Sequence, residues 1–402
     1  MTQKQIEEAL KKCKGKYVTI FYNNDTWSGR VSVVSVHVEK SSVSIGESNG
    51  TLDFYSYWNA CRLYFEFVLA ITSGNKTPHT VLTFGADPEL FFVNGDNVMV
   101  PSTEVMPADT EGVTRDGFQV ELHPHANQCR QLAANHIRNC LSDARRIATD
   151  AGLRLSYKLA YTVTDDVWKR TPRTTKQFGC HPTENAQETQ PKRSSGQREK
   201  FRAGGGHIHV GQMTKKMKDN LPTLVKIMDI VVGNTLVLLD RDEANITRRK
   251  NYGRAGEYRP KPYGMEYRVP SNFWLKHYVL WSLATGQIRN AITHFSNGQA
   301  QRLLKQFDMK DIRNAINNND YDLALKNFNK YTAFLEKENI PTSSGISVHN
   351  YKNFLGWLEL DNPLKELGSM SDKAIDKRWT SLSATSEDGF ERFISDYPQQ
   401  VQ

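Results

Sequence analysis

The chain has 402 residues, of which 38% are hydrophobic and 24% charged, and its formal net charge is +8 at pH 7. This composition predicts a folded protein with a sizeable core and excludes a disordered chain. No long apolar run that could span a membrane is present, and charges occupy the first residues where a secretion signal needs an apolar stretch. We therefore expect a cytoplasmic protein without a membrane partner. Five cysteines without a CxxC pair favour free thiols over disulfides or a zinc ribbon.

Residues 1–79 predict a small β-rich accessory domain, with a short helix over 3–13 and then short strands rich in Val and Tyr between turn residues. Residues 80–402 predict a second domain whose helical C-terminal part begins at about 300. Its strands and helices are mixed without βαβ regularity, so we predict an α+β fold with a largely antiparallel sheet. The main expected elements are strands over 81–93, 117–124 and 258–270, and helices over 126–151, 221–239, 274–295, 320–337 and 351–358.

The stretch VLTFGADPELFFV, residues 81–93, places Asp87 and Glu89 two residues apart on one face of the predicted strand. Pro88 cannot donate a ladder hydrogen bond, which predicts an edge or a distortion there. Two carboxylates on one face repel each other unless a cation lies between them. The alternative is a turn with a solvent-exposed charge pair.

The stretch GFQVELHPH, residues 117–125, repeats the pattern with Gln119 and Glu121 on one face. An inward glutamate on an apolar strand is costly unless it is paired or binds a metal. The alternative is the solvent face of a half-exposed strand. The two histidines that follow, His123 and His125, are more often structural.

The stretch RAGGGHIHVGQ, residues 202–212, puts His207 and His209 on the same face of a strand and Ile208 on the other. The three glycines allow another backbone or a phosphate to approach closely. This arrangement suits a metal or nucleotide site. The alternative is a pair of hydrogen-bonded histidines within a packed sheet.

The positive charge gathers in two stretches. Residues 168–202 contain nine Lys or Arg against three Glu, and residues 248–268 contain seven against two. Such patches attract anions, so the candidates are nucleic acid, a nucleotide triphosphate or an acidic substrate. The polar composition of residues 169–202 predicts a long mobile loop.

The second basic stretch also contains Glu266 and Arg268, which share a strand face. Arginines give planar, bidentate contacts to phosphate and carboxylate, although a basic surface loop with one salt bridge would look similar. The arginines of this stretch are Arg248, Arg249, Arg254, Arg259 and Arg268. Carboxylates, histidines and arginines without a GxxxxGK[ST] loop suggest ATP chemistry with Mg²⁺ or Mn²⁺ outside the P-loop class.

In their order along the chain, DPE, a strand glutamate, GGHIHVG and an Arg/Gly-rich run ending in ExR are similar to a known family. The chain resembles the phage carboxylate–amine ligases (COOH–NH2 ligase type 2, or amidoligases) of the glutamine synthetase and glutamate–cysteine ligase superfamily over roughly residues 81–290. The resemblance implies a curved, mainly antiparallel sheet forming an open funnel with helices behind it. It also implies ATP and Mg²⁺ or Mn²⁺ on the inner face, amide-bond formation through an acyl phosphate, and work in a host cytoplasm, with a homo-oligomer in keeping with the superfamily.

The resemblance implies a role for each matching residue. The implied metal ligands are Asp87, Glu89, Glu121, Glu266 and one of the two histidines, His207 or His209, with the other touching nucleotide or substrate. Asp87 is shorter than the family's glutamate and would reach a metal through water. The implied catalytic residues are Glu266, Arg259 and Arg268, and the implied nucleotide or substrate contacts are His207, His209, Arg249 and Arg254. The substrates would be a small-molecule or peptide carboxylate and an amine.

Two other functions compete with a ligase. The first is a nucleic-acid-binding or interaction protein built on a ligase-like shell, with loop 169–202 and the N-terminal unit as its working surface. The second is a metal-dependent hydrolase that uses the two histidines. It would need no ATP and would leave the arginine cluster unexplained.

Overall fold

The computed structural model describes five short strands before residue 53 and then residues 82–106, 110, 112–127, 130–177, 183–188, 199–338 and 370–381. The helices expected over 3–13 and 351–358 lie outside these residues. Within the described part of the chain, no helix is long and apolar enough to cross a membrane.

The N-terminal strands form two small antiparallel sheets. β1 (Tyr17–Tyr22) pairs with β2 (Asp25–Arg30). β3 (Val34–His37), β4 (Ser42–Ile45) and β5 (Thr51–Leu52) form a three-stranded sheet. These five strands agree with the strands expected here, whereas a separate β-rich accessory domain over 1–79 stays a prediction.

The first large sheet has the order β11-β7-β10-β9, and a short strand β8 pairs with β7. Its strands are β7 (Glu89–Val93), β8 (Met99–Val100), β9 (Val113–Asp116), β10 (Gln119–Leu122) and β11 (Arg154–Ser156). Helix α4 (Arg130–Asp150) packs against it and buries Ile137, Leu141 and Ala144, which belong to the apolar stripe read from the sequence. Cys140 on the same helix is a buried free thiol.

The second large sheet has the order β13-β16-β17-β15-β6. Its strands are β6 (Thr83–Ala86), β13 (Glu184–Asn185), β15 (Ile208–Gly211), β16 (Glu257–Lys261) and β17 (Gly264–Tyr267). A further pair, β12 (Ala160–Thr162) and β14 (Phe201–Ala203), leads into it. Every pairing in these sheets is antiparallel.

Two segments that were each expected to form one strand form two strands instead. Residues 81–93 form β6 and β7, which belong to different sheets, because the chain leaves one sheet and enters the other at Asp87 and Pro88. Residues 258–270 form a hairpin of β16 and β17, because Pro262 interrupts the ladder.

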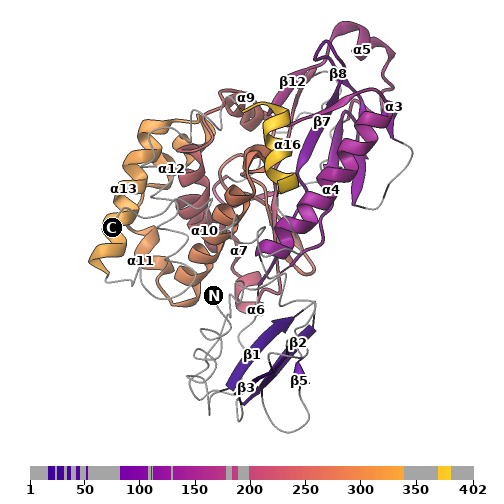
Figure 1. Cartoon of the computed structure of the whole chain (residues 1–402). Helices are drawn as coiled ribbons and strands as arrows, with labels where there is room; N and C mark the ends of the chain where they lie inside the picture. Colours follow the sequence, from indigo (N-terminus) through magenta and orange to yellow (C-terminus); the bar gives the residue numbers. More distant parts are fainter. Residues whose placement is uncertain are drawn as a thin grey trace.

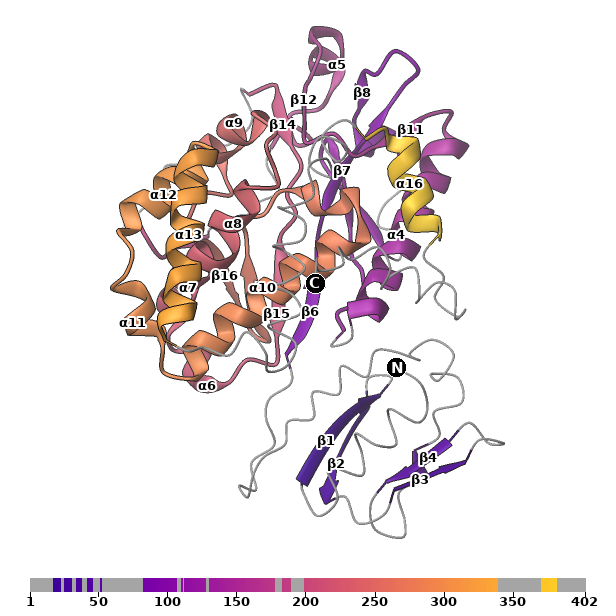
Figure 2. The same ribbon diagram turned by 60° about the vertical axis from the view of Figure 1, so that its left-hand side comes forward.

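Two groups of helices pack against the sheets (Figures 1 and 2). One group is α4 and α16 (Asp372–Ser381), which contact each other. The other group is α7 (Leu221–Met228), α8 (Asn234–Val237), α9 (Ala244–Asn251), α10 (Tyr278–Ser296), α11 (Ala300–Leu304), α12 (Met309–Asn317) and α13 (Tyr321–Lys337). Helix α10 contacts both α7 and α4 and so connects the two groups. Shorter helices are α3 (Ser102–Val105), α5 (Asp165–Arg170), α6 (Lys215–Lys218) and the 3-10 helix η2 (Asn272–Lys276).

The expected α+β class with antiparallel sheets and flanking helices is confirmed. The expected single curved sheet is not found among the described strands. After residue 80 they form two five-stranded sheets and the separate pair β12–β14 instead. The two sheets meet where β6 becomes β7, so the break at Asp87 and Pro88 places residues of both sheets side by side.

The buried helix expected over 221–239 contains a π-helical turn, η1 (Asp229–Gly233), between α7 and α8. Asp229 in this turn is fully buried. Its Oδ1 accepts a hydrogen bond from Tyr267 Oη at 2.8 Å, and its Oδ2 accepts one from Gln187 Nε2. Burial raises the pKa of Asp229 to about 7, although the hydrogen bonds from Tyr267 and Gln187 oppose the shift.

Asp229 should make stability depend on pH. Its folded pKa lies above its ordinary value of 3.8, so the folded state binds the proton more tightly, and the stabilisation present below pH 4 is lost as the pH rises to about 7. Asp229→Asn mimics the protonated acid. The free energy of unfolding of this variant, relative to the parent protein, should therefore rise by about 4 kcal/mol between pH 4 and 7 and then level off. Urea unfolding at several pH values measures this difference, and a flat difference would contradict the buried proton.

Candidate functional site

The register of the second sheet aligns four residues across four strands. His209 of β15 pairs with Gly85 of β6 on one side and with Glu266 of β17 on the other, and Glu266 in turn pairs with Arg259 of β16. Residues directly opposite each other in a sheet point to the same face. The neighbouring row, which includes Ile208, is buried among core side chains on the opposite face. The sheet thus separates an apolar face from a polar one.

Asp87 lies at the break between the two sheets and contacts both histidines. Its Oδ1 is 3.3 Å from His207 Nδ1, and its Oδ2 is 3.0 Å from His209 Nε2. Burial tends to raise the pKa of Asp87, but the positive charge of the adjacent imidazoles outweighs it and holds that pKa well below its usual range. Both histidines therefore share one strand face, as the sequence predicted, and the face is directed at a carboxylate.

Glu266 is the most enclosed charge of the site, with a side chain that is 0% exposed. Its Oε2 is 2.9 Å from Arg259 Nη1 and 3.3 Å from Lys261 Nζ. Its Oε1 is 3.4 Å from Arg268 Nε and 3.5 Å from His207 Nδ1. Burial and Asp87 raise the pKa of Glu266, and the charges of His207, Arg268 and Arg259 overcome them and lower it. The carboxylate is therefore ionised and balanced by cations.

Glu89 is held by donors from three other segments. Gln119 Nε2 and the backbone N–H of Gly205 each donate to its Oε2 at 2.7 Å, and Tyr252 Oη donates to the same atom at 3.1 Å. The backbone N–H of Glu89 donates to Gly205 O at 2.9 Å. Glu89 thus links β7 to the glycine segment before His207. It points inward, as expected, and has the hydrogen-bond partners that a buried carboxylate needs.

Glu121 is only half-buried, and its backbone pairs with that of Glu89 across β10 and β7. Its Oε2 is 3.5 Å from His123 Nε2. Burial raises the pKa of Glu121, with the hydrogen bond from His123 opposing it and the charges of Asp87 and Glu89 adding to it. Nearby Asp116 has its pKa raised to about 7 by burial and by Glu89, Glu121 and Asp87. Negative charge therefore accumulates on this side of the site.

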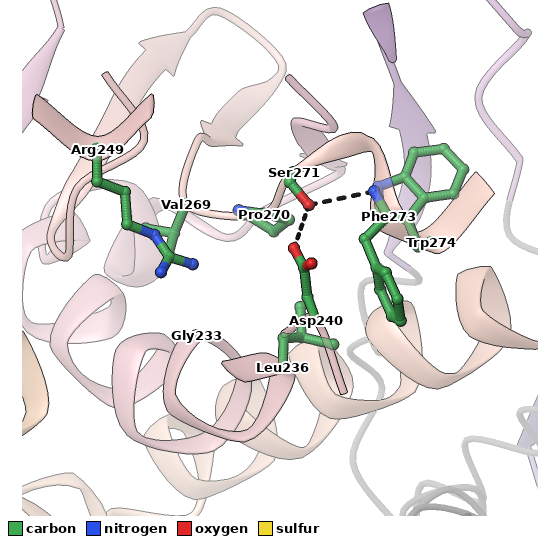
Figure 3. Close-up of a pocket in the computed structure, with 9 residues that line it drawn as sticks. All are labelled: Gly233, Leu236, Asp240, Arg249, Val269, Pro270, Ser271, Phe273 and Trp274. Carbon is green, nitrogen blue, oxygen red and sulfur yellow. Dashed lines mark hydrogen bonds between the residues drawn. The ribbon is translucent and has the colours of Figure 1, made fainter. Parts of the chain in front are cut away.

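Arg249 and Arg254 lie elsewhere, and in the described structure neither contacts the cluster of Asp87, His207 and Glu266. Arg249 donates to Ile316 O and, at 2.9 Å, to Asn319 Oδ1. It lines a cavity of about 10 Å³ beside Asp240 and Ser271 (Figure 3), which is room for no more than a water molecule. Arg254 Nη1 lies 3.4 Å from Glu188 Oε2. Their nucleotide-binding roles stay predictions.

The single long basic loop expected over 169–202 is wrong in part, because its described residues include β13, which pairs with β16, and its ends belong to α5 and β14. Arg202 is buried, and its guanidinium packs on the rings of Phe118 and Trp168, 4.9 and 5.4 Å from their centres. Arg170 Nη2 lies 3.1 Å from Glu104 Oε2. The positive charge of Arg202 therefore lies inside the protein and does not contribute to a basic surface. Residues 178–182 and 189–198 lie outside the described part, so the mobility of this loop stays a prediction.

Three side chains of the site suit a divalent cation. One ligand atom from each of Asp87, His207 and Glu266 lies within 4.8 Å of the others, and all three residues are buried. Asp87 Oδ1 and Glu266 Oε1 accept no hydrogen bond from any described residue, although each lies near His207 Nδ1. Buried carboxylate oxygens need such a partner, and two oxygens with one imidazole nitrogen suit Mg²⁺ or Mn²⁺.

Sequence reasoning missed Lys261, Tyr252 and Tyr263. Lys261 could have been found, because it lies two residues after Arg259 and therefore shares its strand face. Tyr252 reaches Glu89 from the end of α9, and Tyr263 reaches His209 from the turn of the hairpin. No spacing in the sequence indicates either of these contacts.

Residues 193–337 match the model of the phage phiEco32-like COOH.NH2 ligase-type 2 family. This match confirms the resemblance over that range, which includes both histidines, Glu266 and Arg268 but neither Asp87 nor Glu89. It also extends the likeness beyond the limit of about residue 290 set from the motifs. The search of curated proteins found no match.

The glycine segment should tolerate no side chain. A Cβ on Gly206 would lie 2.0 Å from Ser271 O, so Gly206→Ala should lower the free energy of unfolding by about 3 kcal/mol through overpacking. Gly95→Ala is the matched control, because a Cβ there has nothing within 4 Å and should change stability by less than about 0.5 kcal/mol. Urea unfolding compares the two. Equal stabilities would show that the backbone contact is not tight.

A divalent cation should stabilise the folded protein. At a concentration one hundred times its dissociation constant, Mg²⁺ or Mn²⁺ should add about 2.7 kcal/mol and raise the Tm. Asp87→Asn removes one ligand charge and should abolish this response, whereas Asp96→Asn, in the exposed turn before β8, should keep it. Thermal unfolding with and without metal measures the shift. A response that survives in Asp87→Asn would place the cation elsewhere.

Proposed function

We propose that the protein is an ATP-dependent carboxylate–amine ligase whose reaction centre is the cluster of Asp87, His207 and Glu266. One observation supports this most strongly. A buried triad with the ligand types of a divalent cation adjoins Arg259, Lys261 and Arg268, so a cation site and an anion site lie next to each other. A nucleotide triphosphate bound to a metal needs both. The family match over residues 193–337 supports the same activity.

Asp87, His207 and Glu266 would hold Mg²⁺ or Mn²⁺. The cation would neutralise charge on the phosphate oxygens during transfer. The low pKa values of the two carboxyl groups keep them ionised and ready to bind at neutral pH. The second histidine, His209, contacts Asp87 through its Nε2 atom.

The basic residues of the hairpin would bind the transferring phosphate. The Arg259 and Lys261 side chains are 20% and 26% exposed, whereas that of Arg268 is 1% exposed. We assign the first two to contact with the phosphate and Arg268 to holding Glu266 in place. This assignment modifies the direct phosphate contact that the resemblance implies for Arg268.

The reaction consists of two substitutions. An oxygen of the substrate carboxylate attacks the γ-phosphorus of ATP, the bond to the β,γ-bridging oxygen breaks, and ADP leaves. A cationic amine first loses a proton to solvent, and its neutral nitrogen then attacks the carbonyl carbon of the acyl phosphate. Inorganic phosphate departs, and the second proton passes from the nitrogen to the departing phosphate or to solvent. Arg259 and Lys261 stabilise the negative charge on the phosphoryl oxygens. The acidic side of the site, around Glu121 and Asp116, suits the cationic form of an incoming amine.

Glu266→Gln should abolish ATP turnover. The change removes the negative charge that Arg259, Lys261 and the metal share, and we expect release of ADP and phosphate to fall at least about a thousandfold. The assay supplies ATP, Mg²⁺ or Mn²⁺, and a pool of amino acids and polyamines. In the parent protein, release that requires both metal and pool would indicate a ligase, and release without the pool would indicate plain ATP hydrolysis and contradict the ligase proposal.

Glu338→Gln is the matched control. It also breaks an Arg–Glu pair, with Arg302 at 2.7 Å, but this pair joins α11 to the end of α13. It should retain full turnover. Circular dichroism and Tm establish that Glu266→Gln is folded. Arg259→Gln, on the more exposed side of the cluster, should lose turnover too. It tests the same site with a variant that should disturb the fold less than Glu266→Gln. Normal turnover in both variants would refute the site. Salt-dependent nucleic-acid binding without ATP binding would instead support the interaction-protein alternative.

A further inference from the structure

Helix α16, near the C-terminus, has a buried row of side chains next to a charged row. Ile375 and Trp379 are four residues apart and are 1% and 0% exposed. Asp372 and Asp376 are also four residues apart, and both accept hydrogen bonds from other segments. The helix lies outside residues 193–337, the range that matches the family model. Its contacts are therefore a feature of this chain that the family match does not include.

The two aspartates attach α16 to the first sheet and to α4. Asp372 Oδ1 accepts a hydrogen bond from the backbone N–H of Tyr157 at 3.0 Å, and its Oδ2 accepts one from Arg154 of β11. Asp376 Oδ1 accepts hydrogen bonds from Tyr157 Oη at 2.6 Å and from Arg145 Nη1 of α4 at 2.9 Å. Both views show α16 beside α4 (Figures 1 and 2).

The buried row of α16 contacts the 3-10 helix η2, which follows the second sheet. Trp379 Nε1 donates to Leu275 O at 2.6 Å, and the indole packs edge-on against Tyr278, with ring centres 6.1 Å apart. A tryptophan that is fully buried and has a partner for its N–H contributes strongly to packing. Helix α16 therefore connects the first sheet to the segment that follows β17.

The same 3-10 helix holds the backbone next to His207. Trp274 Nε1 donates to Gly206 O at 3.0 Å. A Cβ on Gly206 would lie 2.6 Å from that nitrogen, so the indole and the glycine are in close contact. Leu275, whose carbonyl accepts from Trp379, is the next residue after Trp274. One short helical turn thus lies between the buried tryptophan of α16 and the backbone of the site.

The 3-10 helix also contacts the first sheet where the two sheets meet. Asn272 Nδ2 donates to Glu89 O at 2.9 Å, at the beginning of β7. Ser271, directly before η2, forms an isolated β-bridge with Gly205. Both sheets supply residues to the site at this junction, so a shift of η2 would move the glycine segment relative to β7.

We propose that α16 is a C-terminal clasp and that its Trp379 is a positioning residue for the site. It acts through η2, because it contacts Leu275 and the neighbouring Trp274 holds the residue before His207. The aspartates of the helix join the clasp to β11 and α4, so that η2 is held relative to the first sheet. The consequence for metal binding rests on the proposed function, whereas the consequence for the backbone does not.

Hydrogen exchange distinguishes positioning from a general gain in stability. The backbone N–H groups of residues 204–206 all donate hydrogen bonds, so their exchange reports opening of this segment. In the full-length protein, mass spectrometry of overlapping peptides measures this exchange and that of α12. Trp379→Ala should accelerate exchange at residues 204–206 at least about tenfold and affect α12 much less.

Phe328→Ala in α13 is the matched control. It also removes a buried ring, which is 3% exposed, but α13 packs against α12. It should accelerate exchange in α12 more than at residues 204–206, the reverse of the pattern in Trp379→Ala. Equal acceleration of both segments in Trp379→Ala would show that α16 adds stability alone and would overturn the proposal.

A second variant tests the clasp without opening the core. Asp376→Asn removes the charge that faces Arg145 and leaves Trp379 in place. It should accelerate exchange at residues 204–206 in the same pattern as Trp379→Ala, by a smaller factor. If Trp379→Ala does not fold, this variant decides. Unchanged exchange at residues 204–206 in Asp376→Asn would then refute the clasp.

Manganese affinity extends the test to the proposed metal site. In a titration with Mn²⁺ followed by electron paramagnetic resonance, Trp379→Ala should weaken binding about tenfold, and Phe328→Ala should leave it unchanged. Equal affinity in the parent protein and Trp379→Ala would refute the positioning role and leave the metal site intact. Absence of Mn²⁺ binding in the parent protein would refute the metal site, and the exchange pattern would then decide on the clasp by itself.

Discussion

The buried carboxylate of Glu266 is the constraint on which the site depends. An unpaired carboxylate in a protein interior costs several kcal/mol, so its neighbours must supply positive charge. Arg259, Lys261 and Arg268 do so from the same hairpin, and His207 approaches from the adjacent strand segment. Removal of any single cation would leave the charge under-compensated. The charges of the hairpin therefore depend on one another, and its basic residues form the anion-binding side of the site.

The second requirement is close backbone approach. Gly205 exchanges hydrogen bonds with Glu89, through its carbonyl to the backbone and through its N–H to the side chain. Side chains at Gly204 or Gly206 would collide with Glu89 O or Ser271 O, at 2.6 and 2.0 Å. These contacts attach the beginning of β7, an inner strand of the first sheet, to the segment just before β15. Asp87 thereby meets the histidines, although it precedes them by more than a hundred residues.

Much of the fold could be predicted from local patterns. The apolar stripe on α4 and the strand around Ile208 were predicted correctly, because burial on one face imposes a period on the sequence. The break at Pro88 was predicted as a distortion, but the transfer of the chain between two sheets was not, because strand periodicity says nothing about partners. For the same reason one curved sheet was expected where the described strands after residue 80 form two five-stranded sheets and the pair β12–β14. The π-helical turn at Asp229 was not predicted, because the apolar residues on both sides of it continue a helical pattern.

The sequence by itself determined which chemical groups are available: inward carboxylates, two histidines on one strand face, and arginines next to glycines. Alternation along a strand is a local property, so the shared face of His207 and His209, and that of Glu266 and Arg268, followed from spacing alone. Only the tertiary structure decided which groups meet. Register between strands brought Glu266 to Arg259 and His209, while Arg249 was turned towards Ile316 and Tyr263 was placed against His209. Those contacts depend on sheet pairing and helix packing between distant segments, which no local pattern specifies.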